Sequence, residues 1–488
     1  MYILFVLRCL ILLTFIALCF SHLHARGTRC GTVQPVRVLA KSANFENCRQ
    51  GALNVLERRT TKFIIYYTLQ GVHAVKTEAY IDSLAKYLED AYSLHKDILG
   101  MGDIRGRIRT IHYQKDVPVG FYPVEVIDTG MLRGYEGDYA DTYGLIPPPL
   151  NSQSTQVIIE NDFLRGADCT GKLSTIPFTS AATGYNYSEP DKWHLALKVT
   201  TYHELYHSFQ LYQTRLTDHS IFWAEASATG VEEIAAPSID DYINYLEPYN
   251  PRTIDNSKGG YDWASLYLFL YSELGPRFDS YIWKHYAASP REGFAIQLAK
   301  HANSIGKNVE DLFHKYAAFM FFSGQRAQYL PDSLKSSTTV LNDLPAWPTW
   351  NLWGATPRVM PVGSFYFLAK SSDAMPTIDS VARISYLEYG NASVWVLSRL
   401  LEKDYVPSEL GPKELMAYPN PWNPKKNPNL YFRNSNGVEI RSSSGALMTR
   451  LKSEKDTLVW QPQKLPAPGI LYYRTLPHGK NKVLIVEY

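Results

Sequence analysis

The sequence predicts an α+β domain followed by all-β C-terminal domains, and three observations support this prediction. Segments rich in β-branched and aromatic residues dominate the chain up to Glu160. From Lys192 to Phe322, apolar residues recur at three- and four-residue spacing, which is typical of helices. Beyond Asp343, tryptophans stand among prolines and short strand-like segments return. A chain of 488 residues has room for roughly two to four such domains.

The first part is predicted to combine strands with one helix. β-branched and aromatic residues predict strands over 62–68, 109–113 and 156–160. Apolar residues from Ile81 to Leu99 share one helical face, and Gly100 stands where a C-terminal cap belongs.

Helices are predicted to dominate the second part, and strands the third. Apolar stripes predict helices over 195–211, 222–236, 261–274, 294–302 and 309–322. Asn308, which precedes two acidic residues closely, is a typical N-cap for the last of these helices. Short β-rich segments predict strands over 365–368, 381–387 and 393–397.

Two changes in composition predict domain boundaries. The first lies near Asp343, and the second lies near Pro412, because the proline-rich segment 418–424 cannot enter a helix or a central strand. We therefore expect one domain over residues 26–344, a β-rich middle domain over 345–411 and a C-terminal β-sandwich over 412–488.

Composition excludes several classes of protein. Hydrophobic residues make up 45% of the chain and charged residues 20%, and no fixed-period repeat is present, so disordered, collagen-like and solenoid proteins are excluded. The formal net charge is only +2 and no basic cluster stands out, so nucleic acid is not expected as a partner.

Residues 1–25 are predicted to be a secretory signal peptide. Arg8 precedes an apolar run from Cys9 to Phe20, and Ala25 is a suitable small residue for cleavage. An uncleaved membrane anchor is the alternative, because the segment is nearly long enough to span a bilayer. No later run approaches that length, so we expect an exported protein, extracellular or at the cell surface, without a transmembrane domain beyond the signal.

Three cysteines remain after removal of the signal: Cys30, Cys48 and Cys169. In an oxidising compartment, the sequence-local pair Cys30 and Cys48 is the predicted disulfide, which closes a loop worth roughly 3 kcal/mol. Cys169 would then be a free thiol. Its neighbours provide no base or positive charge, which favours a structural role over a nucleophilic one.

The strongest chemical signal is an HExxH motif, His203-Glu204-Leu205-Tyr206-His207, within a predicted helix. Residues four apart lie on one helical face with Cβ atoms about 5–6 Å apart, so both imidazoles can bind one Zn²⁺. Glu204, one position along, is expected beside the metal as the general base.

The next predicted helix offers a third ligand, which a catalytic zinc requires in addition to an open position for water. Glu225 and Glu232 share one face of that helix. We expect Glu225 to bind the metal and Glu232 to orient a ligand histidine. The alternative is an ordinary amphipathic HExxH helix whose histidines are satisfied by neighbours, with Glu225 as a surface carboxylate on an alanine-rich helix.

These motifs resemble those of the gluzincin superfamily, which includes thermolysin and the zinc aminopeptidases. The resemblance is carried by HExxH, by Trp223-x-Glu225-x-x-Ala228 and by the later Glu232. Segments 29–32, 63–67, 157–163, 203–210 and 222–225 resemble more closely a bacterial family of predicted secreted metallopeptidases. This resemblance implies a zincin-like, thermolysin-like catalytic domain. Ala226 stands where many gluzincins have glycine, and no Gly-Ala-Met-Glu-Asn-type strand is found, so exopeptidase activity is not implied.

The C-terminal part resembles a type IX secretion sorting domain, which is an immunoglobulin-like sandwich. The resemblance is carried by the segments 418–424, 469–473 and 480–486. It implies the type IX secretion machinery as a partner. The chain ends in Val486-Glu487-Tyr488, whereas such domains often end in a lysine-rich tail. A sandwich that merely caps or attaches the enzyme is the alternative.

Together these observations predict a secreted zinc metalloendopeptidase that acts on protein or peptide substrates. Zn²⁺ held by His203, His207 and Glu225 would activate water, and Glu204 would move its proton. Tyr261 is a candidate stabiliser of the oxyanion, with Tyr281 and His285 as other candidates. Two alternatives remain: a surface adhesion or scaffold protein with a structural or vestigial zinc site, and a zinc hydrolase of a non-peptide bond.

Overall fold

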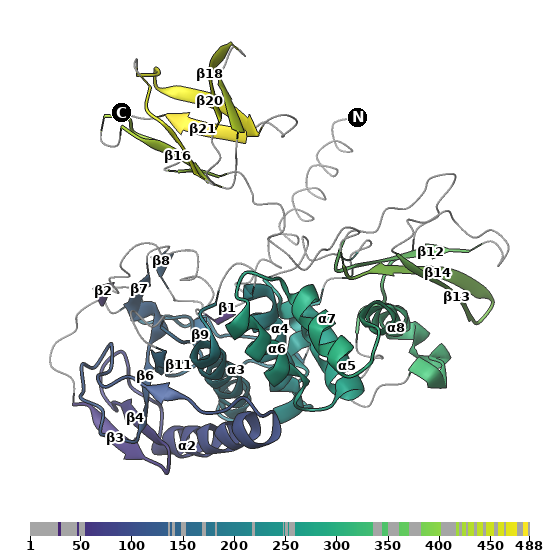
Figure 1. Ribbon diagram of the computed structural model, residues 1–488. Helices are drawn as coiled ribbons and strands as arrows, with labels where there is room; N and C mark the ends of the chain where they lie inside the picture. Colours follow the sequence, from purple (N-terminus) through teal and green to yellow (C-terminus); the bar gives the residue numbers. More distant parts are fainter. Residues whose placement is uncertain are drawn as a thin grey trace, which may run out of the picture. The chain divides into compact units, whose positions relative to one another are not determined.

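The computed structural model of the chain divides into two compact units, residues 1–405 and 406–488, and each is described by itself (Figure 1). The predicted signal peptide, Cys48 and Cys169 lie outside the described residues, and only the backbone of Cys30 is described, so the disulfide stays a prediction. The structure describes residues 28–30, 46–47, 54–134, 137–138, 142–147, 153–167, 172–180, 183–216, 220–246, 248, 252, 259–334, 344–349, 361–369, 382–401, 416–418, 422–425, 428–433, 437–442, 446–452, 457–462, 465–475 and 482–486.

A six-stranded sheet forms one side of the first unit. Its strands follow the order β1 (Thr28–Cys30), β9 (Thr142–Leu145), β11 (Val157–Glu160), β6 (Tyr122–Ile127), β4 (Phe63–Tyr67) and β3 (Leu56–Arg59). The three strands β4, β6 and β11 are parallel, whereas β3 and β9 run antiparallel to β4 and β11. β1 pairs in parallel with β9 at the edge. The strands predicted over 62–68 and 156–160 are confirmed.

Alternate side chains of this sheet enter two different clusters. In β11, Ile159 joins the main core with α2 (Glu78–Ser93) and α3 (Trp193–Gln213). Its neighbour Ile158 joins a smaller cluster, because successive side chains of a strand point to opposite faces. The helix predicted from Ile81 is confirmed as α2, and it continues into a π-helical turn over Leu94–Ile98 before Gly100, whose φ is 72°.

The prediction of a strand over 109–113 is wrong. These residues form a single isolated bridge between Arg109 and Asp116. The backbone N–H groups of residues 111–113 donate to the carboxylate of Glu125 at 2.6–3.2 Å, so a buried side chain takes the donors that a strand would use.

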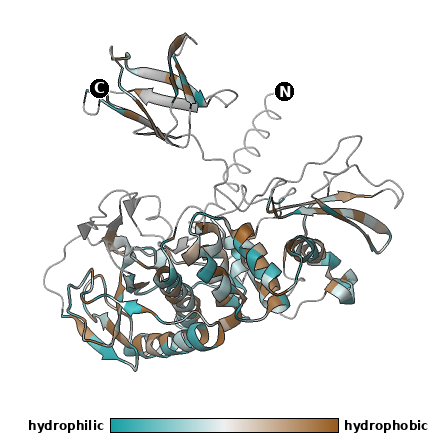
Figure 2. Cartoon of the chain, in the orientation of Figure 1, coloured by the Kyte–Doolittle hydropathy of each residue, from teal (hydrophilic) through white to brown (hydrophobic). Residues whose placement is uncertain are grey.

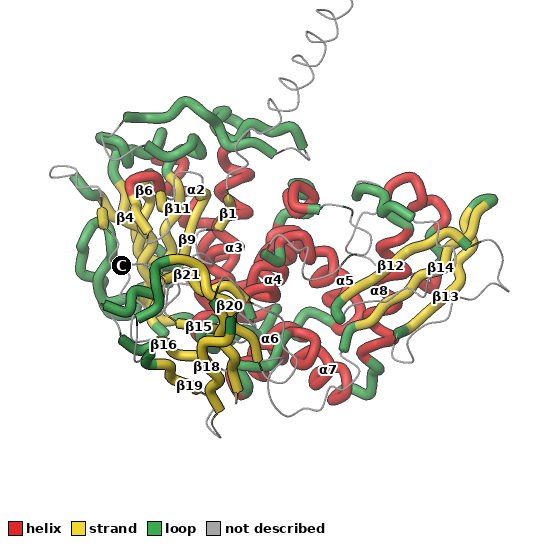
Figure 3. The backbone as a smooth tube through the Cα atoms, turned by 90° about the horizontal axis from the view of Figure 1, so that it is seen from above, coloured by secondary structure: helices red, strands yellow, loops and turns green. Residues whose placement is uncertain are grey.

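Helices follow one another after α3 and lie between the six-stranded sheet and a smaller sheet (Figures 1 and 3). They are α4 (Ile221–Ala235), α5 (Ala264–Leu274), α6 (Phe278–Ala288), α7 (Phe294–Ser304) and α8 (Val309–Phe321). Both hydrophobic and hydrophilic residues occur on these helices (Figure 2). Asn308 caps α8 by accepting from the N–H groups of Glu310 and Asp311, as predicted. The sequence did not predict α6.

The smaller sheet consists of β12 (Gly363–Leu368), β14 (Ala392–Arg399) and β13 (Arg383–Tyr389), in that order and antiparallel. Tyr366 and Val396 enter the main core beside α8. The described residues of the expected middle domain, up to Leu401, therefore belong to the first unit.

The second unit contains two antiparallel sheets that bury one apolar core. One sheet consists of β15 (Met416–Tyr418), β16 (Leu430–Arg433) and β19 (Thr457–Trp460), and the other of β18 (Leu447–Lys452), β17 (Gly437–Arg441), β20 (Gly469–Thr475) and β21 (Lys482–Val486). Across the described parts of the chain, none of the helices has both the length and the hydrophobicity of a membrane span.

Candidate metal centre

Helices α3 and α4 carry the predicted ligands, and both are deeply buried. α3 is buried along most of its length because it lies between the sheet and the other helices. Small residues let α4 approach its neighbours: a Cβ atom added at Gly230 would lie 2.3 Å from a ring carbon of Tyr267 on α5. This contact holds α4 closely against α5.

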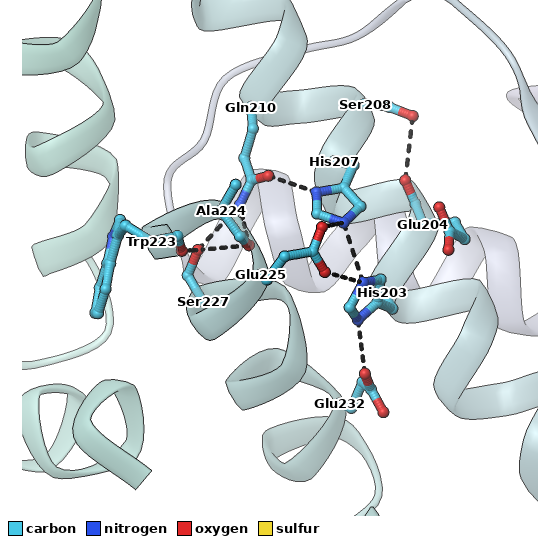
Figure 4. Close-up of polar contacts among 10 residues, drawn as sticks. All are labelled: His203, Glu204, His207, Ser208, Gln210, Trp223, Ala224, Glu225, Ser227 and Glu232. Atoms are coloured by element: carbon cyan, nitrogen blue, oxygen red, sulfur yellow. Dashed lines mark hydrogen bonds and ion pairs between the residues drawn. The ribbon is translucent and has the colours of Figure 1, made fainter. Parts of the chain in front are cut away.

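His203, His207 and Glu225 converge at the contact between α3 and α4 (Figure 4). The Nε2 atoms of His203 and His207 are 3.0 Å apart. Glu225 Oε2 lies 3.3 Å from Nε2 of His203, and its Oε1 lies 3.3 Å from Nε2 of His207. Glu225 is fully buried, so it is not a surface carboxylate.

Contacts at the other ring nitrogens fix both imidazoles. Nδ1 of His203 lies 2.6 Å from Oε1 of Glu232, and Nδ1 of His207 lies 2.7 Å from Oε1 of Gln210. Because carboxylate and amide oxygens only accept hydrogen bonds, a neutral imidazole at either position carries its proton on Nδ1. The lone pair of each Nε2 then faces Glu225, which is the tautomer that a metal ligand requires.

Gln210 is a supporting residue that the motifs of the sequence did not indicate. Its Nε2 donates to the carbonyl oxygen of Ala224 at 3.2 Å and to Ser227 Oγ at 2.9 Å, so the amide joins α3 to α4. The signal for it was the three-residue spacing from His207, which places both side chains on one helical face.

The site favours a positive charge between these groups. Burial lowers the pKa of His203, but the hydrogen bonds and charges of Glu225 and Glu232 outweigh burial and raise it to about 10. Burial raises the pKa of Glu225, but His207 and His203 outweigh it and lower this pKa to about 2. Either a proton or a metal ion can supply that charge.

The donor set fits zinc. Two imidazoles and one carboxylate are a frequent ligand set of catalytic zinc, and Zn–N distances of about 2.0–2.1 Å imply ligand atoms about 3.3–3.4 Å apart in a tetrahedron. The separations of 3.0, 3.3 and 3.3 Å are close to this value. A divalent cation would also balance the two buried carboxylates of Glu225 and Glu232.

Glu204 is buried on α3 beside the converging ligands (Figure 4). It lies against β9 of the six-stranded sheet, because a Cβ atom added at Gly144 would come within 2.9 Å of Glu204 Cγ and 2.8 Å of Thr200 Cγ2. A larger residue at position 144 would therefore displace Glu204. The arrangement puts a carboxyl group next to the ligand set without making it one of the converging groups.

Tyr261 is the candidate stabiliser that the structure brings to the site. Its ring lies parallel to that of His203, with centroids 6.0 Å apart, and also stacks on Tyr245 at 4.8 Å. Gly260, with φ of 113°, permits this approach, because a Cβ atom there would lie 2.1 Å from the carbonyl oxygen of Phe222. Tyr281, by contrast, is exposed on α6 and stacks on His301 of α7.

His285, the third candidate stabiliser, also lies on α6. Burial lowers its pKa, with a further contribution from Lys300. No contact places it at the converging ligands among the described residues.

No protein-family model and no curated protein matches the chain. Among solved structures, the chain is similar to PorZ, described as an essential bacterial surface component of the type-IX secretion system of Porphyromonas gingivalis. The match has 19% sequence identity and a TM-score of 0.14, and it covers 15% of this chain and 12% of PorZ. A likeness of this size carries no argument about fold or function.

Proposed function

We propose that this protein is an exported zinc metallopeptidase that hydrolyses peptide bonds in protein or peptide substrates. The observation that carries the proposal is the convergence of His203, His207 and Glu225 in a buried site. Each histidine has its Nδ1 atom held by an acceptor, so both Nε2 atoms are available to a metal ion.

The chain's own residues divide the chemistry between them. His203, His207 and Glu225 would hold the zinc ion, which supplies Lewis-acid chemistry by polarising a peptide carbonyl and making water more acidic. Glu204 accepts the proton of the attacking water and returns it to the leaving amine. Tyr261 is the proposed donor to the oxygen on which negative charge develops.

Replacing Glu204 by glutamine tests this division. Glu204→Gln keeps the shape of the side chain and should retain zinc, while peptide hydrolysis falls by a factor of about 10²–10⁴. Glu233→Gln is a matched control on α4, because burial and the neighbouring Asp240 raise the pKa of Glu233 to about 9, so the substitution removes no charge at neutral pH.

The outcomes separate the alternatives. Zinc bound in full by the unmodified protein, with no hydrolysis of a broad peptide and protein library, would favour an adhesion or scaffold protein. Hydrolysis of ester or other non-peptide substrates alone would favour a zinc hydrolase of a non-peptide bond. Equal loss of zinc and activity in Glu204→Gln would mean that Glu204 is itself a ligand or that the variant does not fold, and circular dichroism of the variant separates these two outcomes.

We also propose that residues 406–488 act as a sorting domain for the type IX secretion machinery. The supporting observation is that they form a compact unit with an apolar core of its own. Deleting these residues should leave zinc content and hydrolysis unchanged while the protein accumulates in the periplasm of a host with that machinery. Arrival of the truncated protein at the cell surface would contradict the sorting role.

A further inference from the structure

A further buried carboxylate, besides Glu204, Glu225 and Glu232, lies on a helix that the sequence did not predict. Asp279 on α6 is fully buried and is surrounded by neutral donors. Its Oδ2 accepts a hydrogen bond from the hydroxyl of Tyr206 and another from Trp283 Nε1 at 3.1 Å. Its Oδ1 accepts from Trp223 Nε1 at 2.5 Å.

The donors belong to the two helices that carry the ligands. Tyr206 lies on α3 between the two histidines of the HExxH motif, and Trp223 lies on α4, two positions before Glu225. Each oxygen of Asp279 thus binds a different ligand-bearing helix. The third donor, Trp283, lies on α6 itself, one turn beyond Asp279.

Apolar packing alone would leave the relative position of α3 and α4 less defined. Leucine and alanine contacts tolerate small shifts, whereas hydrogen bonds are directional and fix both distance and angle. A metal site built from two helices needs this precision, because an error of about 0.5 Å already impairs ligand geometry. Gln210 joins α3 to α4 on one side of the site, and Asp279 joins the same helices through α6.

The carboxylate is costly to bury. Burial raises the pKa of Asp279 to about 7, even though hydrogen bonds from its neighbours lower it; these neighbours are Tyr206, Trp223, Trp283 and Ser227. An apolar residue would fill this position at lower cost in solvation, so the presence of a carboxyl group calls for a role that its hydrogen bonds provide.

We propose that Asp279 is a positioning residue of the metal centre: through Tyr206 and Trp223 it fixes the spacing of α3 and α4 and hence the geometry of the three zinc ligands. The inference rests on the zinc site of the proposed function. It does not depend on which bond the enzyme hydrolyses.

The test measures zinc affinity of the full chain by competition with a chelator, which needs no substrate. Tyr206→Phe and Trp223→Phe each remove one donor from a ligand helix and should weaken zinc binding about tenfold. Trp283→Phe is the matched control, since it removes a buried indole donor from the same carboxylate, and Trp283 lies on α6 and not on a ligand-bearing helix. It should change zinc affinity by less than about twofold.

A spectroscopic measurement separates positioning from stability. With Co²⁺ in place of zinc, the ligand-field bands of Tyr206→Phe and Trp223→Phe should shift, whereas those of Trp283→Phe should match the unmodified protein. Thermal unfolding of the metal-free proteins shows whether the three variants lose similar stability. Asp279→Asn, which is nearly isosteric and retains one acceptor, should give an intermediate zinc affinity if the larger changes prevent folding.

If the zinc affinity and the Co²⁺ spectra of all four variants equal those of the unmodified protein, the inference is overturned, but the proposed zinc site is not. The inference is also overturned if Trp283→Phe lowers zinc affinity as much as Tyr206→Phe and Trp223→Phe do. The loss of affinity would then reflect lower folding stability and not the position of α3 and α4. Absence of zinc binding in the unmodified protein would instead overturn the proposed function, and the inference with it.

Discussion

Two buried carboxylates, one in each unit, show how differently this chain balances charge in its interior. In the second unit, Glu439 on β17 forms ion pairs with Arg441, Arg450 and Arg474 at 2.6, 2.8 and 3.1 Å. Hydrogen bonds from Arg441 and Arg450 lower its pKa to about 2. Guanidinium groups are always charged, so the chain itself neutralises Glu439.

In the first unit, Glu225 faces two imidazoles instead of arginines. Imidazoles can be neutral, and the contacts at Nδ1 of His203 and His207 direct both Nε2 lone pairs towards the carboxylate. The comparison teaches that burial of a carboxylate does not identify a functional site. The identity of its partners does: of these two carboxylates, Glu225 alone faces groups that can be neutral, and we propose that a metal ion binds there.

The largest expected effect concerns the ligands themselves. Glu225→Ala and His207→Ala should lose most of the bound zinc, because each removes one of three ligands. Metal analysis after dialysis against a weak chelator measures this loss. Full zinc content in either variant would place the metal elsewhere. Glu225 would then be, like Glu439, a buried carboxylate without a role in metal binding.

A smaller effect is expected from the residues that hold the imidazoles. Glu232→Ala and Gln210→Ala should each weaken zinc binding about 10–100-fold, because the ligand histidine loses the acceptor at Nδ1. Chelator competition gives the affinities. If Glu232→Ala proves more damaging than Glu225→Ala, the assigned roles of these two carboxylates are reversed.

His95 is a third buried ionisable group, and unlike Glu225 and Glu439 it has no charged partner in the described part of the chain to balance its ionised form. His95 is fully buried, neither of its ring nitrogens has a hydrogen-bond partner among the described residues, and burial lowers its pKa from 6.5 to about 3. Between pH 6.5 and pH 3, the unfolded chain binds a proton that the folded chain excludes. Stability therefore falls as pH falls through this range, by at most about 1.4 kcal/mol per pH unit from this group.

His95→Phe should remove that pH dependence. Between pH 7.5 and pH 5, the free energy of unfolding of the unmodified protein should fall by about 2 kcal/mol more than that of the variant. Denaturant unfolding of metal-free protein at the two pH values measures the difference. Parallel pH profiles would show that His95 finds a partner in the folded state.

The smallest effect is expected at Glu439. Glu439→Gln leaves three arginines close together, which should lower the thermal stability of the second unit, but these side chains are 35–57% exposed and water screens their repulsion. Zinc content should not change. Calorimetry of the full chain detects the lower unfolding temperature of the second unit, and added salt should reduce the difference between the variant and the unmodified protein. A loss of zinc in Glu439→Gln would contradict the conclusion that Glu439 has no part in metal binding.

The sequence alone determined the local geometry of the site. The four-residue spacing of His203 and His207 and the shared face of Glu225 and Glu232 follow from the helical repeat, which depends on near neighbours in the chain. The same reasoning predicted most helices of the first unit and the cap at Asn308. It failed for 109–113, where composition favoured a strand but the long-range acceptor Glu125 binds the backbone.

Which of these faces meet depends on the tertiary structure. It buried Glu225 between two histidines, brought Tyr261 to His203 while leaving Tyr281 exposed, and set Gly144 against Glu204. It also placed Asp279, on a helix that no pattern predicted, between the two ligand helices. Periodicity records which side of an element is apolar, but the partner of that side depends on packing between residues far apart in the chain, and local sequence does not encode it.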